Sequence, residues 1–139
     1  MLDEIYYEVD EFCKREHELL QKLLLSNNAF YAVNQRHVET LHATSPLKPT
    51  ITVSTQHLDN QIIIKVKDNG IGMGDATKAK VFQSFFTTKP TGQGTGLGLS
   101  LAYDIVTKGH SGTLEVESTE GVGSEFIITL PNNLANDFQ

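Results

Sequence analysis

Residues 91–100 read TGQGTGLGLS, and this glycine-rich stretch runs directly into a segment whose apolar spacing predicts a helix over 97–108. A glycine loop at a helix N-terminus presents unpaired backbone N–H groups and the positive end of the helix dipole, which suits a phosphate group. No Gly-Lys-Ser/Thr follows, so the loop is not a Walker motif, and no predicted strand directly precedes it as in a Rossmann turn. A flexible linker is the plain alternative, but a linker rarely continues into an amphipathic helix.

Two predicted β-hairpins flank this segment. Residues 50–57 and 61–67 alternate apolar with polar side chains and are expected to pair around an Asp59-Asn60 turn. Residues 113–118 and 124–130 are expected to pair in the same way, around a glycine-containing turn.

Helices are expected between and before the hairpins. Apolar residues recur at three- and four-residue intervals over about 9–34, which predicts one long helix, and a shorter helix is expected over 75–85. Residues 87–96 should form a mobile loop. The order of elements predicts an α/β (α+β) two-layer sandwich, with the helices on one face of a mixed sheet.

Length and composition exclude several classes of protein. A chain of 139 residues fits one domain, and a net charge of −6 argues against a nucleic-acid partner. No apolar stretch approaches the roughly 18 residues of a membrane span, and the acidic N-terminus is unlike a signal peptide. The lone Cys13 cannot form an internal disulfide. We expect a cytoplasmic domain, alone or as the cytoplasmic part of a membrane-bound sensor, that itself contacts no membrane.

Two further motifs contain chemistry-bearing residues. Residues 68–73, DNGIGM, follow a predicted strand, and a carboxylate there can accept a hydrogen bond from an amine while the glycine backbone packs against a ring. Ordinary turn chemistry is the alternative explanation of Asp-Asn-Gly. Residues 121–126, GVGSEF, suit a hairpin turn, in which Ser124 is a candidate ligand-facing residue.

Together with Asn27-Asn28-Ala29 in the first helix, these segments resemble the GHKL ATPase superfamily, and within it the catalytic domain of bacterial sensor histidine kinases. The resemblance covers about residues 23–131, with residues 1–22 as an N-terminal helical extension and 132–139 as a polar tail. Its five boxes, in chain order, are the N box at 28–33, G1 at 68–73, F at 82–90, G2 at 94–99 and G3 at 121–126. The short lid and the FFTTKP segment favour histidine kinases over the gyrase, chaperone and mismatch-repair branches. The implied architecture is a Bergerat-type ATP-binding fold.

The resemblance implies that the ligands are ATP and Mg²⁺. Asp68 would accept a hydrogen bond from the adenine amine, Asn28 would coordinate Mg²⁺, and Lys89 and Gln93 would reach the terminal phosphate. Phosphoryl transfer would rest on positioning and charge neutralisation. The implied catalytic residues are Asn28, Lys89 and Gln93, and the implied nucleotide-binding residues are Asn28, Tyr31, Asp68, Gly70, Gly72, Met73, Thr87, Thr88, Gly94, Thr95, Gly96, Leu97, Gly98, Leu99 and Ser124. Phe82, Phe85 and Phe86 are expected to serve as lid hinges and packing.

The implied reaction donates the γ-phosphoryl group to a histidine on a separate dimerisation module, and a response regulator would be an indirect partner. His17 lies only 11 residues before Asn28, which leaves no space for the second helix of such a module, so His17 is expected to be a solvated surface residue. The chain is expected to behave as an excised or reworked catalytic domain, and as a monomer when isolated.

Two residues depart from the family pattern. Leu24 stands one helical turn before Asn28, where the family usually has a polar residue, and leucine can neither bind a metal nor orient a nucleophile. An ATP-binding module with impaired or absent transfer therefore stays open as the alternative function, beside a less favoured hydrolytic ATPase. Ser111 replaces a usual glycine and should cost little unless the backbone there needs a positive φ.

Overall fold

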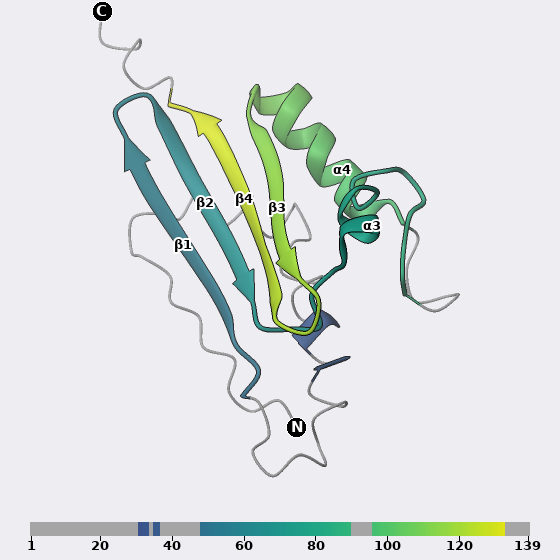
Figure 1. Ribbon diagram of the computed structural model, residues 1–139. Helices are drawn as coiled ribbons and strands as arrows, with labels where there is room; N and C mark the ends of the chain where they lie inside the picture. Colours follow the sequence, from purple (N-terminus) through teal and green to yellow (C-terminus); the bar gives the residue numbers. More distant parts are fainter. Residues whose placement is uncertain (1–30, 34, 37–47, 90–95, 133–139) are drawn as a thin grey trace, which may run out of the picture.

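Four antiparallel strands form the sheet of the computed structural model, which describes residues 31–33, 35–36, 48–89 and 96–132 (Figure 1). The first hairpin consists of β1, Ile51–Leu58, and β2, Gln61–Asp68. The second consists of β3, Thr113–Thr119, and β4, Gly123–Pro131, and the strand order is β1-β2-β4-β3. Both predicted hairpins and the two-layer arrangement are confirmed.

The prediction of a mixed sheet is wrong in its detail, because each pairing between the described strands is antiparallel. The helical crossover after β2 does return β3 parallel to β2. However, β4 folds back from β3 and inserts between them, so the two parallel strands are not neighbours.

The helices differ from prediction mainly at their ends. α3 is a single turn, Asp75–Lys78, shorter than the predicted 75–85. After it the backbone closes three-residue turns, with the Lys80 N–H donating to the Thr77 carbonyl and the Gln83 N–H to the Lys80 carbonyl. α4, Gly98–Asp104, continues into a π-helical turn, η1, Ile105–Gly109, and together they match the predicted helix at 97–108.

Most of the predicted N-terminal helix lies outside the described residues, as do the N-terminal extension at 1–22 and residues 133–139 of the polar tail. Residues 31–33 are helical, as expected, and residues 35–36, beyond the predicted end at 34, are helical as well. Figure 1 shows them at the end of the sheet where β2 ends and β3 turns into β4. The Ile71 N–H donates to the Ala32 carbonyl at 3.2 Å, so this helical segment is joined to the loop after β2.

The core lies between one face of the sheet and the α4–η1 helix. Alternate strand residues point inward, and Ala102 and Val106 of the helix are buried against them. The inward-facing buried apolar residues of the sheet are Ile51, Val53, Ile64, Val66, Leu114, Phe126, Ile128 and Leu130. The helices therefore cover one face, as predicted. Within the described part of the chain, no helix is long and apolar enough to cross a membrane.

Candidate functional site

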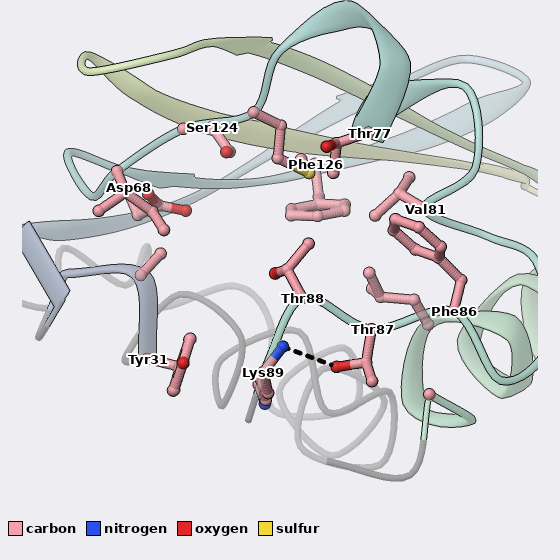
Figure 2. A pocket seen from close by; sticks show the side chains of 16 residues that line it. Tyr31, Asp68, Thr77, Val81, Phe86, Thr87, Thr88, Lys89, Ser124 and Phe126 are labelled. Atoms are coloured by element: carbon pink, nitrogen blue, oxygen red, sulfur yellow. Dashed lines mark hydrogen bonds between the residues drawn. The ribbon is translucent and has the colours of Figure 1, made fainter. Parts of the chain in front are cut away.

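A pocket opens at the end of the sheet where β2 ends and β4 begins (Figure 2). Its volume is about 160 Å³, and a protein cavity of about 150 Å³ is known to hold a benzene ring, so a planar ring system fits. Its walls come from the helical segment at 31–32, the loop after β2, α3 and the segment at 86–89. The lining residues are Tyr31, Ala32, Asp68, Ile71, Gly72, Met73, Thr77, Val81, Phe86, Thr87, Thr88, Lys89, Gly96, Leu99, Ser124 and Phe126.

Asp68 is the buried carboxylate of this pocket, with only 4% of its surface exposed. The Gly70 N–H donates to its Oδ1 at 2.9 Å, and the Ser124 N–H donates to the same carboxylate. Burial raises the pKa of Asp68 above its ordinary value, and these two hydrogen bonds oppose the rise. The carboxyl group is thus held in place by the backbone, with capacity left to accept a donor from a ligand.

The glycines after Asp68 are needed for packing against the protein itself. A Cβ on Gly70 would overlap the backbone and Cβ of Ala32, and Gly70 does not line the pocket. Gly72 has φ 66° and lies against the Thr119 carbonyl, so a side chain there would be both strained and blocked. Gly70 therefore lets the loop after β2 approach the helical segment closely, and Gly72 lets it approach the β3–β4 turn.

Arg36 connects the helical segment at 35–36 with the loop after β2 and with the β3–β4 turn. The sequence motifs did not point to this residue. Its Nη1 donates to the carbonyls of Val122 at 2.6 Å, Asn69 at 3.0 Å and Gly70 at 3.3 Å. The Asn69 side chain in turn accepts from the Thr50 N–H at 2.9 Å. The loop that carries Asp68 is therefore tied to the helical segment, to the β3–β4 turn and to the start of β1.

The opposite wall is apolar and aromatic. Phe86 and Phe126 line it together with Val81 (Figure 2). Phe82 packs against Tyr103 and Phe126, with ring centroids 5.3 Å and 6.4 Å away, which agrees with its expected packing role. Phe85 is instead 75% exposed and has φ 65°.

Lys89 supplies positive charge beside the pocket. Its Nζ lies 4.8 Å from the centroid of the Tyr31 ring, in a cation–π contact. The backbone N–H of Lys89 donates to Thr87 Oγ1 at 3.1 Å. Gly96 is the first residue of the described range 96–132. It has φ 70° and packs against the backbone of Phe85.

The pocket brings together most of the predicted nucleotide-binding residues that the structure describes. Those that line it are Tyr31, Asp68, Gly72, Met73, Thr87, Thr88, Gly96, Leu99 and Ser124. Lys89, predicted as a catalytic residue, lines it as well. Gly70, Leu97 and Gly98 are described but do not line it. Asn28, Gln93, Gly94 and Thr95 lie outside the described residues, as does Leu24. Ala32, Ile71 and Phe126 line the pocket and lie within the N, G1 and G3 boxes, but they were not predicted to bind the nucleotide. Thr77 and Val81 line it from outside the boxes, and Phe86, expected to serve as a lid hinge and to pack, also lines it.

No group of three or more histidine, cysteine, aspartate or glutamate side chains within the described ranges is arranged to hold a metal ion. A magnesium ion bound with a nucleotide does not require such a cage, because phosphates and water supply most of its ligands.

Comparison with known proteins agrees with this geometry. Residues 22–134 match the family described as histidine kinase-, DNA gyrase B- and HSP90-like ATPases. The signal transduction histidine-protein kinase AtoS of Escherichia coli K12 is 36% identical over 121 residues, which are 85% of this chain and 17% of AtoS. The sensor histidine kinase ZraS of the same organism is 37% identical over 117 residues, 84% of this chain and 22% of ZraS. The chain thus spans about a fifth of the length of these two relatives.

Solved structures share the fold. The nucleotide-free catalytic domain of the histidine kinase ThkA has a TM-score of 0.54 at 23% identity, covering 83% of this chain and 91% of that domain. The mycobacterial sensor histidine kinase MprB has a TM-score of 0.52 at 25% identity, covering 75% of this chain and 70% of that structure. Because the family match extends over most of its residues, this chain belongs to the histidine kinase-, DNA gyrase B- and HSP90-like ATPases, as an ATP-binding domain of the sensor histidine kinase kind.

Proposed function

We propose that this chain binds Mg-ATP in the pocket beside Asp68 and donates the γ-phosphoryl group to a histidine on a separate dimerisation module. The observation that carries the proposal is the buried Asp68 carboxylate at one end of an otherwise largely apolar pocket. A flat, apolar ring with an amine at its edge satisfies both features, since the ring fills the pocket and the amine donates to the carboxylate.

The phosphate groups would then extend toward Lys89 and the glycine loop. Asp68 and Lys89 both line the pocket and lie apart from each other in it (Figure 2), so one ligand could span both residues. An ammonium group there would offset phosphate charge, and a bound phosphate would replace the Tyr31 ring as the partner of Lys89 Nζ. Asn28 is proposed to coordinate Mg²⁺, with Gln93 and the N–H groups of residues 94–98 completing the phosphate contacts.

Transfer would need no nucleophile from this chain. The attacking group would be the histidine imidazole of the other module, and this domain would contribute positioning and charge neutralisation. A response regulator would receive the phosphoryl group from that histidine and would not contact this pocket. A cytoplasmic location is part of the proposal, because ATP is the phosphoryl donor.

Calorimetric titration with a non-hydrolysable ATP analogue tests the binding step. Saturable binding that tightens with Mg²⁺ is expected, with weaker binding by Asp68→Asn under the same conditions. A folded sample that binds no nucleotide with or without Mg²⁺ would refute the proposal.

A second experiment tests transfer. The chain would be mixed with radiolabelled ATP and a purified dimerisation module that carries a phosphoacceptor histidine, with a His→Ala version of that module as control. Acid-labile label on the intact module alone supports the kinase function. Binding without transfer, followed by transfer once Leu24→Asn is introduced, would instead assign the alternative of a binding module impaired by Leu24.

A further inference from the structure

A row of three polar residues crosses the inner face of the sheet at the pocket end. Asp68 of β2 pairs directly with Ser124 of β4, and Ser124 pairs directly with Ser118 of β3. We call Asp68, Ser124 and Ser118 the polar row. The neighbouring inward-facing positions are apolar: Val66 and Phe126 belong to the core, and Val116 packs against it. Ser118 does not line the pocket, so its place in this row calls for a role other than direct contact with a ligand.

The hydrogen bonds of Ser118 fix the direction of its proton. A serine hydroxyl has one proton to donate and two lone pairs to accept with. The Met73 N–H donates to Ser118 Oγ at 2.8 Å, which occupies one lone pair. The Gly123 carbonyl lies 2.9 Å from Oγ and can only accept, so it takes the proton of Ser118. Ser124 Oγ, at 2.8 Å, must therefore donate its own proton to the remaining lone pair of Ser118.

This arrangement leaves Ser124 as an acceptor toward the pocket. Its hydroxyl proton points to Ser118, its lone pairs remain, and Ser124 lines the pocket next to Asp68 (Figure 2). The N–H groups of Gly70 and Ser124 are likewise used by the Asp68 carboxylate, and the Met73 N–H is used by Ser118. Four donors at this end of the pocket therefore form hydrogen bonds within the protein: the Ser124 hydroxyl and the backbone N–H groups of Gly70, Met73 and Ser124.

We propose that Ser118 is a positioning residue that makes the pocket wall at Asp68 and Ser124 accept hydrogen bonds, and thereby sets the preference for a purine with an exocyclic amine over one with a carbonyl at the same position. The proposal rests on the proposed function. An amine brings two N–H donors to this wall. A carbonyl oxygen would face a carboxylate and a hydroxyl lone pair, leaving buried acceptors unpaired, which is strongly disfavoured.

The test compares the dissociation constants of ATP and inosine triphosphate, whose base has a carbonyl in place of the adenine amine. Titrations use the full chain and three variants: Ser118→Ala, Ser118→Thr and Ser124→Ala. Wild type should prefer ATP, and Ser118→Ala should lower that preference by about tenfold, the equivalent of one lost hydrogen bond, because the freed Ser124 hydroxyl can then donate into the pocket. Ser118→Thr retains the hydroxyl and should retain the preference.

A double-mutant cycle separates this role from a merely structural one. With Ser124→Ala in the background there is no hydroxyl to orient, so Ser118→Ala should leave the ratio of the two dissociation constants unchanged. The proposal is overturned if Ser118→Ala weakens both nucleotides equally, or if it changes the ratio equally with and without Ser124. If Ser118→Ala does not fold, Ser118→Cys provides the same comparison, because a thiol is a weak donor and acceptor of similar size.

The wild-type protein distinguishes failure of this inference from failure of the proposed function. Equal affinity for the two nucleotides would overturn the inference and leave nucleotide binding intact. Binding of neither nucleotide by folded protein would overturn the proposed function itself.

Discussion

Asp68 at the end of β2 and Ser124 near the start of β4 are direct cross-strand partners, and the Ser124 N–H donates to the Asp68 carboxylate. Strand pairing, which stabilises the sheet, therefore also places the charged group of the pocket. Both side chains are buried, at 4% and 7% exposure, and they are the buried polar side chains among the residues that the structure describes. Keeping a carboxylate in this position has a cost to folding that ligand binding can offset.

Replacing Asp68 by Asn should therefore change stability and binding in opposite directions. Without nucleotide, Asp68→Asn should raise the melting temperature at neutral pH, because a buried charge is removed while the amide oxygen can still accept from the Gly70 N–H. Affinity for an ATP analogue should fall about tenfold to a hundredfold, the loss expected for a hydrogen bond to a charged group. Melting and calorimetry on the same samples check both parts. A variant that is destabilised without nucleotide would contradict the argument.

The stability difference should depend on pH with a definite sign. The pKa of Asp68 is raised in the folded state above its ordinary value of 3.8, with burial as the main cause. Below pH 3.8 the carboxyl is protonated in both states, so wild type and Asp68→Asn should be similarly stable. As the pH rises through 3.8 and then through the raised folded pKa, wild type should lose stability relative to the variant, and the difference should then stay constant. Melting curves from about pH 3 to about pH 8 measure it, and a difference that does not vary with pH would rule out Asp68 as its source.

Arg36 should matter for both stability and binding, since its Nη1 bridges Val122, Asn69 and Gly70. Arg36→Met retains the apolar stem but removes the donors, and it should lower the free energy of unfolding by about 1–3 kcal/mol. Arg36→Lys retains the charge and a donor but not the fork of the guanidinium, so its loss should be smaller. Urea unfolding gives the free energies, and titration should show weaker nucleotide binding in the same order. If Arg36→Met is as stable as wild type, these bonds contribute no net stability.

The sequence predicted the parts of the molecule that depend on local patterns. The strands β1 to β4 follow from alternation of apolar and polar residues and from glycine or Asp-Asn turns, and the position of Asp68 follows from a strand that ends in DNG. The length of α3 was not predictable in this way, because the apolar spacing of residues 79–85 suits a helix, whereas the N–H groups of Lys80 and Gln83 bond three residues back.

Contacts to backbone atoms account for most of what the sequence could not reveal. Arg36 binds three carbonyl oxygens, which every residue type possesses, so no motif marks its partners. Ser118 is recognised only through the strand register that places it opposite Ser124. Val81 lies outside the quoted motifs, and Phe126 lies within GVGSEF but has no polar group that would mark it as a ligand, so the part of both in the pocket depends on tertiary packing.

Gly96 should be intolerant of any side chain. It has φ 70°, and a Cβ there would overlap the backbone of Phe85. Gly96→Ala should therefore displace the backbone that leads into α4 and weaken nucleotide binding at least about tenfold, since a left-handed conformation alone costs about 1–2 kcal/mol. Gly109→Ala is the matched control, because nothing lies within 4 Å of its added Cβ, and it should bind nucleotide as wild type does. Equal affinities for both variants would show that the Gly96 conformation is not required.

Ser111 carries a side chain at a position where the backbone conformation favours glycine. Its φ is 55°, in the left-handed region, directly after the helix formed by α4 and η1. Ser111→Gly should relieve strain of about 1–2 kcal/mol and lose about 0.5–1 kcal/mol to the greater freedom of glycine in the unfolded chain. A net gain of about 1 kcal/mol in the free energy of unfolding is expected, with unchanged nucleotide affinity because Ser111 does not line the pocket. Chemical denaturation measures it, with Ser111→Ala as a control that keeps the strain. A glycine variant no more stable than the alanine variant would mean that the left-handed backbone at this position is not strained.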